Sequence, residues 1–366
     1  MSKIVFIVQQ LSQPRCIKRI QYFKNSGYDC LVFGFNNGLY TENLKNVGFD
    51  VKEEWFIDKS FIKPKKINIY KKNINHVISQ INNDDIIYAF GFEIGTLVSF
   101  LWKYKFIYEE ADVSAARIKN IFIRFFFVYL DKRIIRKSIL TIFTSEGFQE
   151  YLFGKANPYS YKTLFIHNKL HDSFIDKERP IGVEFNDKNI KFGFIGLIRY
   201  PNTIVRFAKI VGSNFPHHEF HFFGEVEGDS LNQINWTIFP NVKFHGKFKN
   251  PQDLNSIYCK IDINVVCYDP TSGNVRIAEP NKLYESIFFN KPLIVSQGTF
   301  LQKRVEDLQV GYAINALSDS AIINFIQSIT SNNIYILQNN CSLVSSDQLI
   351  NNASLEMNKI KAYLIK

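Results

Sequence analysis

The segment IKFGFIGLIRYPNT, residues 190–203, passes from a short apolar run into the start of a helix. Residues 190–196 have the nearly continuous apolar composition of a strand that is buried on both faces. Pro201 suits the first turn of a helix, where a backbone N–H would have no partner within the helix. A buried strand followed directly by a helix is the repeating unit of a parallel sheet covered by helices.

The same alternation of strand and helix continues on both sides of this segment. The expected later strands span residues 219–224, 241–246, 261–266, 292–296 and 311–314, and the expected earlier ones span 3–8, 30–35, 85–90, 105–110, 139–145 and 161–168. Between the two sets lies a polar stretch, residues 171–189, which breaks the pattern. We therefore predict an α/β fold with two Rossmann-like, doubly wound parallel-sheet domains.

The length of 366 residues agrees with two domains, because it is about twice the ~150 residues typical of one. We place the domains at residues 1–180 and 181–345. Residues 346–366 end in the helical pattern NASLEMNKIKAYLIK, and we expect this C-terminal helix to pack back on the N-terminal domain. Open parallel sheets bind ligands at the carboxyl ends of their strands, so we expect a ligand cleft between the two sheets.

The composition excludes several classes of protein. With 46% hydrophobic and 21% charged residues, the chain is neither disordered nor fibrous. Its five cysteines are scattered and lack metal-type spacing, which favours a reducing, cytoplasmic setting over a disulfide-bonded secreted module. The N-terminus MSKIVFIVQQ lacks the features of a signal peptide, and no stretch has the ~20 apolar residues needed to cross a bilayer.

The positive charge is concentrated in the first half of the chain. Residues 1–180 contain 27 Lys and Arg against 18 Asp and Glu, whereas the whole chain has a net charge of +10. Within residues 117–137, seven basic residues and one acidic residue surround the apolar run IFIRFFFVYL, residues 121–130. Two interpretations stay open: a buried core helix, or a helix that lies in the headgroup layer of an anionic membrane at the inner leaflet.

Nucleic acid is the other anionic partner that a basic chain suggests. Aromatic side chains can stack on bases, but here they lie in apolar runs such as FIRFFFVY rather than among Lys and Arg. No signature of a nucleic-acid-binding module is visible in the sequence. We therefore expect no nucleic-acid partner.

The segment EPNKLYESIFFNKPLIV, residues 279–295, carries the strongest chemical pattern. Pro280 opens the expected helix, so Lys282 lies in the first turn, where the helix dipole disfavours a cation by ~0.3–1 kcal/mol. Glu285 follows three residues later on the same face. Lysine binds phosphate and glutamate accepts hydrogen bonds from a ribose diol, so the pair predicts a nucleotide site. The alternative is an ordinary ion pair on the surface.

Arg199 is a second candidate for phosphate binding. It precedes the helix that begins near Pro201, and the free N–H groups of a helix N-terminus together with an arginine form an anion site. The alternative is a solvated loop residue.

Three segments together resemble a known family. They are FIGLIRYPN (194–202), NVKFHGKFKNPQDLNSIYCKIDINVVCY (241–268) and PNKLYESIFFNKPLIVS (280–296). In this order and spacing they are similar to the nucleotide-sugar-binding domain of GT-B glycosyltransferases, specifically the family-4-like enzymes of bacterial capsular and surface-polysaccharide biosynthesis. In the N-terminal half, RCIKRIQYFKNSGYDCLVFGF, FIYEEADV and ILTIFTSEGFQEYL also resemble that family.

The resemblance implies a set of donor-site residues. Arg199 would contact the donor diphosphate, Lys282 would lie near the phosphates, and Glu285 would bind the ribose. Gly246 and Lys247 would face the base, and the loop TSGNVR with Asn274 would approach the donor sugar.

The sequence also departs from the family pattern. Many members carry a second glutamate eight residues before the ribose-binding one, where this chain has Ile277, and Glu279 is the nearest substitute. The lysine that usually follows the diphosphate-binding arginine is missing, with Asn202 and Thr203 nearby. The Gly-Gly loop after the first strand is replaced by QQLSQPRC.

Acidic residues after two strands are the acceptor-side candidates. Glu110 and Asp112 follow strand 105–110, where the family has an acidic segment beside the acceptor, and either could deprotonate an acceptor hydroxyl. Arg15, after the first strand, and Glu93, after strand 85–90, are candidates for acceptor binding. The alternative for Glu110 is a structural ion pair with an arginine.

We expect no metal site and no cofactor beyond the nucleotide-sugar donor. His217, His218 and His221 lead into a strand, where alternation would turn them to different faces. The chain has no Asp-x-Asp pair of the kind that bridges a diphosphate through a metal.

The resemblance implies a metal-independent hexosyltransferase that moves a sugar from a nucleotide donor to a hydroxyl of a lipid-linked saccharide, with retention of the anomeric configuration. Three alternatives stay open: an inactive GT-B relative that binds nucleotide or glycan as a partner subunit, a membrane-surface adaptor, and a sugar-nucleotide epimerase. The donor base and sugar, the acceptor, the linkage and the oligomeric state are not specified by these residues.

Overall fold

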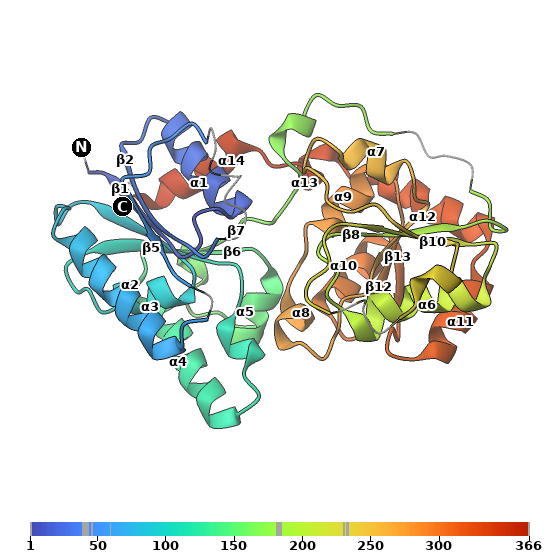
Figure 1. Cartoon of the computed structure of the whole chain (residues 1–366). Coiled ribbons are helices and arrows are strands. Elements are labelled where there is room, and N and C mark those ends of the chain that lie inside the picture. The colour runs from blue at the N-terminus through green and yellow to red at the C-terminus, as the bar shows by residue number, and fades with distance from the viewer. Residues whose placement is uncertain are drawn as a thin grey trace. The chain divides into compact units, whose positions relative to one another are not determined.

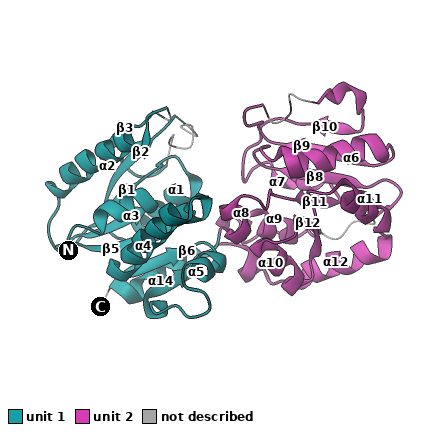
Figure 2. Ribbon diagram, turned by 90° about the horizontal axis from the view of Figure 1, so that it is seen from below, with its two compact units in different colours: residues 1–167, 352–366 teal, residues 168–351 magenta. Residues whose placement is uncertain are grey.

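The computed structural model describes residues 2–38, 44, 47–58, 60–180, 185–229, 231 and 234–364. The chain divides into two compact units (Figure 2): unit 1 comprises Met1–His167 and Asn352–Lys366, and unit 2 comprises Asn168–Asn351. The division falls between His167 and Asn168, before the polar stretch 171–189 in which the sequence analysis placed it. Residues 181–184 of that stretch lie outside the described residues.

Unit 1 is built on one parallel sheet. In the part of the chain that the structure describes, this sheet has seven strands in the order β3-β2-β1-β4-β5-β6-β7, all paired in parallel. The strands are β1 (Ile4–Val8), β2 (Cys30–Asn36), β3 (Glu53–Phe56), β4 (Ile86–Phe90), β5 (Lys105–Glu110), β6 (Leu140–Phe143) and β7 (Thr163–Phe165). Six of them confirm the strands expected from the sequence, and β3 was not expected.

Helices cover both faces of this sheet. They are α1 (Pro14–Asn25), α2 (Lys63–Ile78), α3 (Phe92–Val98), α4 (Ile121–Lys137), α5 (Glu146–Phe153) and α14 (Ala353–Leu364). In Figure 1, α1 and α14 lie on one side of the strands, and α2, α3 and α4 lie on the other. Because side chains alternate along a strand, Tyr108 and Glu110 of β5 face α4, whereas Ile107 and Glu109 face α1 and α14.

The C-terminal helix α14 packs within unit 1. Met357 and Ile360 are fully buried in the same apolar core as Phe6 and Phe23. Arg19 of α1 donates to Glu356 of α14 at 2.8 Å, and both side chains are largely buried. The last helix of the chain therefore completes the cover on the first sheet.

Unit 2 repeats the architecture. Over its described residues, the sheet has six parallel strands in the order β10-β9-β8-β11-β12-β13. The strands are β8 (Lys191–Ile195), β9 (Glu219–Phe223), β10 (Val242–Phe244), β11 (Ile263–Val266), β12 (Leu293–Ser296) and β13 (Gly311–Ile314). All six confirm the sequence prediction.

The helices of unit 2 enclose two apolar cores, one on each face of the sheet. They are α6 (Arg206–Asn214), α7 (Leu254–Tyr258), α8 (Gly273–Ile277), α9 (Lys282–Phe288), α10 (Phe300–Leu308), α11 (Asp319–Ser328), α12 (Ser331–Leu343) and α13 (Ser346–Leu349). The helix expected from Pro201 begins with one wider turn over Pro201–Val205 before α6. The segment TSGNVR, expected as a loop, contains the short helix α8.

The described part of the chain contains no helix that is both long enough and apolar enough to cross a membrane. In both units, the carboxyl ends of parallel strands lie along one edge of the sheet, where loops lead into helices. Such edges are where open parallel sheets bind ligands, and the candidate site residues lie there.

Candidate functional site

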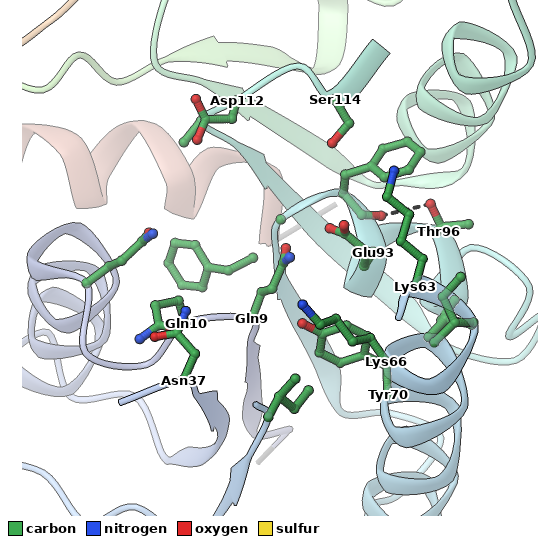
Figure 3. Close-up of a pocket in the computed structure, with 18 of the residues that line it drawn as sticks. Gln9, Gln10, Asn37, Lys63, Lys66, Tyr70, Glu93, Thr96, Asp112 and Ser114 are labelled. Carbon is green, nitrogen blue, oxygen red and sulfur yellow. Dashed lines mark hydrogen bonds between the residues drawn. The ribbon is translucent and has the colours of Figure 1, made fainter. Parts of the chain in front are cut away.

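A pocket of about 690 Å³ lies within unit 1 at the carboxyl ends of its strands. Figure 3 shows Gln9 and Gln10 entering it from the loop after β1, Lys63, Lys66 and Tyr70 from α2, and Asp112 and Ser114 from the segment after β5. The amide, carboxylate and aromatic side chains of this lining are the groups that bind sugar hydroxyls and sugar faces. Three apolar residues of α4 close one wall: Phe126, Phe127 and Leu130.

Three of the predicted acceptor-side residues line this pocket: Arg15, Glu93 and Asp112. The Asp112 carboxylate forms an ion pair with the Arg117 guanidinium at 3.1 Å, and both side chains are more than half exposed. Burial raises the pKa of Tyr70 to about 12, and Glu93 adds to that rise. The structure therefore brings together a solvent-accessible carboxylate, a second carboxylate and a phenol that stays protonated.

Gly91 shapes the floor of the pocket. It has φ of 89°, a conformation that residues with a side chain rarely adopt. A Cβ atom there would lie 2.1 Å from Oε1 of Gln9. The absence of a side chain at Gly91 thus lets Gln9 reach across the end of β4.

Glu110, the other predicted catalytic residue, does not line the pocket. Its side chain is fully buried on the α4 side of the sheet, next to Asp131, which is fully buried as well. Burial, followed by repulsion from Asp131, raises the pKa of Glu110 well above its usual range, and burial does the same to Asp131. The physical reason for this placement is that β5 continues to Glu110, whereas Asp112 already lies in the loop and turns into the pocket.

This carboxyl pair gives a prediction about stability. A carboxyl group whose pKa is raised in the folded state binds more protons than in the unfolded state, so the free energy of unfolding falls as the pH rises between the two pKa values. Asp131→Asn removes one such group. We expect it to stabilise the protein at pH 8, with less gain at pH 5, because the cost of ionising the buried carboxyl group is removed.

The check is the melting temperature of both proteins across this pH range. Asp29→Asn serves as the control, because that carboxylate is 59% exposed. If Asp131→Asn and the wild type lose stability in parallel as the pH rises, the pKa of Asp131 is not raised in the folded protein as described.

Glu109, the neighbour of Glu110, has a structural role. Its fully buried carboxylate forms ion pairs with Arg19 at 3.1 Å and with Arg15 at 3.4 Å, and it accepts a hydrogen bond from Tyr88. The ion pair with an arginine that was the alternative for Glu110 therefore belongs to Glu109. This network holds Arg15, which is 21% exposed, at the rim of the pocket.

In unit 2, three neighbouring strands end in a glycine at the same level of the sheet. The register pairs Ile195 with Phe223 and Phe222 with Phe244, so Gly196, Gly224 and Gly246 follow side by side after β8, β9 and β10. All three have positive φ, of 145°, 138° and 73°. A Cβ atom on Gly224 would lie 1.9 Å from the carbonyl oxygen of Gly196. We call these three residues the glycine row, a strip of sheet edge without side chains.

Lys282 and Glu285 form a buried ion pair in α9. The Lys282 Nζ to Glu285 Oε2 distance is 2.5 Å, and the side chains are 7% and 3% exposed. The pair lies beside the glycine row, because a Cβ atom on Gly196 would be 4.0 Å from Cε of Lys282. A surface ion pair, the alternative considered for these residues, is thus contradicted by their burial.

Further donors surround the Glu285 carboxylate. Oε1 accepts hydrogen bonds from Asn281 at 2.6 Å and Asn250 at 3.2 Å, and Oε2 accepts one from Tyr258 at 3.1 Å. Together with Lys282, each oxygen has two donors, which is the capacity of its two lone pairs. A ribose diol could bind Glu285 only by displacing one of these protein donors.

Arg199 lies on the loop after the glycine row residue Gly196. Its side chain is exposed, and its guanidinium carbon lies 5.3 Å from the ring centroid of Tyr200. The rings of Tyr200 and Tyr268 stack at 5.0 Å. Burial raises the pKa of Tyr268. The neighbouring Tyr200 and Glu285 raise this pKa further, whereas Arg199 lowers it. Arg199 therefore lies beside the stacked rings of Tyr200 and Tyr268.

The other predicted donor-site residues are placed as follows. Lys247, next to Gly246, is 81% exposed and pairs with Glu225. Asn274 is buried in α8. Glu279 is buried, forms an ion pair with Arg304 at 2.7 Å and accepts a hydrogen bond from Tyr284. The ion pair with Arg304 thus fixes Glu279, which lies between α8 and α9, against α10.

The histidines considered as metal ligands have other contacts. His221 hydrogen-bonds to His245 at 3.0 Å and to Glu219 at 2.7 Å. His218 accepts a hydrogen bond from the backbone N–H of Ile190.

Sequence reasoning missed several residues at both sites. Gly224 escaped notice, although Phe-x-Gly recurs at 194–196, 222–224 and 244–246 and could have revealed the glycine row. Asn250 and Tyr258 gave no signal, because their contact with Glu285 is set by tertiary packing. The α2 residues of the pocket, Lys63, Lys66 and Tyr70, gave none either.

No protein-family model matches the sequence, and no curated protein matches it either. Among solved structures, the chain is similar to HepE of Anabaena in complex with UDP and glucose, with 16% identity, a TM-score of 0.71 and 100% coverage of both chains. It is also similar to sucrose-phosphate synthase from Thermosynechococcus elongatus, with 14% identity, a TM-score of 0.71 and 99% coverage of both chains.

A third similar structure is that of MnaA from S. aureus with UDP, with 12% identity, a TM-score of 0.67 and coverage of 100% of this chain and 97% of that one. At these identities the likeness lies in the fold. It confirms the fold class predicted from the sequence: two Rossmann-like parallel-sheet domains with the GT-B fold.

Proposed function

We propose that this chain is a glycosyltransferase that moves a sugar from a UDP-sugar to a hydroxyl of a saccharide acceptor. The observation that carries the proposal is the buried Lys282–Glu285 pair beside the glycine row. A cation held at a sheet edge without side chains suits a diphosphate that approaches the backbone closely. Structures of similar fold contain UDP, and one of them contains UDP-glucose.

The donor would bind at the strand ends of unit 2. In this proposal the Lys282 ammonium and the Arg199 guanidinium neutralise the diphosphate, and the Glu285 carboxylate, released from Lys282, accepts the ribose hydroxyls. As the bond between the anomeric carbon and the phosphate oxygen breaks, the electron pair goes to UDP, and these two cations stabilise it. We propose that they take the place of a metal ion.

The acceptor would bind in the unit 1 pocket. Asp112 is the proposed general base, because its carboxylate lines the pocket and is accessible, whereas Glu110 is buried and its pKa is raised well above its usual range. It takes the proton of the acceptor hydroxyl while that oxygen bonds to the anomeric carbon. Arg117 orients the carboxylate, and Glu93 and Arg15 contact the acceptor's other groups.

We further propose a lipid-linked acceptor in surface-polysaccharide assembly, and retention of the anomeric configuration, for which the acceptor oxygen attacks the anomeric carbon from the same face that UDP leaves. The support for a lipid link is the apolar wall of Phe126, Phe127 and Leu130 opposite the polar side chains of the pocket.

A melting-temperature screen against nucleoside diphosphates tests the donor site. We expect UDP and UDP-sugars to raise the melting temperature, with about 2.7 kcal/mol of stabilisation at 100 times the Kd. The same ligands should shift Lys282→Met much less, relative to its own baseline. No shift with any nucleoside diphosphate, or an equal shift in the variant, would contradict the proposed donor site.

Product analysis separates the transferase from its alternatives. A transferase releases UDP in step with glycosylation of an added acceptor, an epimerase converts the sugar without releasing UDP, and an inactive relative binds UDP without turnover. Sugar conversion in the absence of any acceptor, with UDP retained, would overturn the transferase proposal.

A further inference from the structure

The first half of α4 exposes a row of large apolar side chains. The exposed fractions are 81% for Phe122, 67% for Phe125, 57% for Phe126 and 58% for Tyr129. Their spacing of three and four residues places them on one face of the helix. We call them the α4 apolar stripe. Water contact over so much contiguous aromatic surface is unfavourable, so the stripe indicates an apolar partner.

The second half of α4 holds the helix in unit 1. Ile134 and Ile135 are fully buried, and α4 packs against α3 and α5. At the other end, the side chain of Asn120 accepts hydrogen bonds from the backbone N–H groups of Phe122 and Ile123 at 3.0 and 3.2 Å. The exposed half of α4 is therefore a regular helix with a capped N-terminus, and the other half of α4 anchors it in unit 1 (Figure 1). The buried-core interpretation of residues 121–130 is thus contradicted by the structure.

The accessible charge of the segment that carries the stripe is of one sign. The segment 117–137 carries seven basic residues, and its one acidic residue, Asp131, is fully buried. The accessible charges of this segment are thus all positive. A second copy of the chain docking here would bring these cations against each other, whereas an anionic bilayer offers both acyl chains and opposite charge.

We infer that the α4 apolar stripe inserts into the surface of an anionic lipid bilayer, with the basic residues of 117–137 in the headgroup layer. Phe122, Phe125 and Tyr129 enter the boundary between headgroups and acyl chains. The inference does not depend on the proposed function. If that function holds, Phe126, which belongs both to the stripe and to the pocket wall, marks where a lipid-linked acceptor passes from the bilayer into the pocket.

Co-sedimentation of the full chain with vesicles tests the inference. We expect binding to phosphatidylcholine vesicles that contain phosphatidylglycerol, and weaker binding to phosphatidylcholine alone. The variant Phe122→Ser/Phe125→Ser/Tyr129→Ser should lower the partition coefficient at least about tenfold. Lys132→Glu/Arg136→Glu should lower it on anionic vesicles by a similar factor.

A matched control comes from unit 2. Leu343, Ile238 and Tyr335 are 81%, 64% and 61% exposed, close to the values of the three substituted stripe residues. Their triple serine variant should bind vesicles like the wild type, and unchanged melting temperatures should show that both variants fold.

Three results would overturn the inference. They are no sedimentation of the wild type with anionic vesicles, equal binding by the stripe variant and the wild type, and conversion of a dimer to a monomer by the stripe variant in sedimentation velocity. The last result would assign the stripe to a protein interface. Because these assays contain no sugar donor and no sugar acceptor, their outcome is independent of whether the chain transfers sugar.

Discussion

Asp112→Asn is expected to lower kcat about 10²–10⁴-fold, the range typical for loss of a general base. The asparagine keeps the shape of the side chain but cannot take the proton of the acceptor hydroxyl. Its effect on folding should be small, because Asp112 is 57% exposed in its pair with Arg117. KM for the UDP-sugar should change little, since the donor contacts proposed above lie in unit 2. Steady-state kinetics of UDP release provide the measurement.

Glu110→Gln is the matched comparison. Glu110 is buried and its pKa is raised well above its usual range, so an uncharged amide of the same size should leave kcat within a few-fold of the wild type. A large loss of kcat in Glu110→Gln together with full activity of Asp112→Asn would reverse the assignment.

Lys282→Met and Glu285→Gln are each expected to destabilise the protein strongly. Removing one partner of a buried ion pair leaves the other charge without compensation, which typically costs about 3–5 kcal/mol. For Lys282→Met we expect the lower end, because Asn281, Asn250 and Tyr258 still donate to the Glu285 carboxylate. Both variants should also raise KM for the donor at least about tenfold, since one loses the cation proposed to bind the phosphates and the other the carboxylate proposed to bind the ribose.

The double variant Lys282→Met/Glu285→Gln separates stability from function. With both charges removed, the buried site is neutral again, and denaturant unfolding should show a free energy closer to that of the wild type than either single variant does. Donor binding should stay impaired. Recovery of stability together with recovery of donor affinity would show that the pair is structural and does not bind nucleotide.

The strands could be predicted because a parallel sheet covered on both faces requires nearly continuous apolar runs. KIVFIV and IDINVV satisfy that requirement without any tertiary information. The edge strand β3 was missed because EEWF is short, charged in its first half and alternates between half-buried and exposed residues. The edge of a sheet contacts only one neighbour, so its sequence carries a weaker signal.

The candidate donor site was predicted as far as local spacing allowed. Lys282 and Glu285 are one helical turn apart, so the sequence alone brings them together. Asn250 and Tyr258 reach Glu285 from across unit 2, and no local pattern marks such a contact.

On the acceptor side, the position at which β5 ends determines which carboxyl group lines the pocket. Glu110 and Asp112 would share a face only if the strand continued past both of them. The strand instead ends at Glu110, which remains in the core with Asp131, whereas Asp112 reaches the pocket. The point at which a strand ends depends on the loop that follows, and this chain's loop sequence ADVS does not specify it.

Hydrogen exchange with and without UDP tests the central claim, that a nucleoside diphosphate binds at the strand ends of unit 2. The account predicts slower amide exchange on UDP binding in residues 196–200, 246–250 and 281–286, with no slowing in these segments for Lys282→Met. Protection confined to the segments that line the unit 1 pocket, or no protection at saturating UDP, would contradict it.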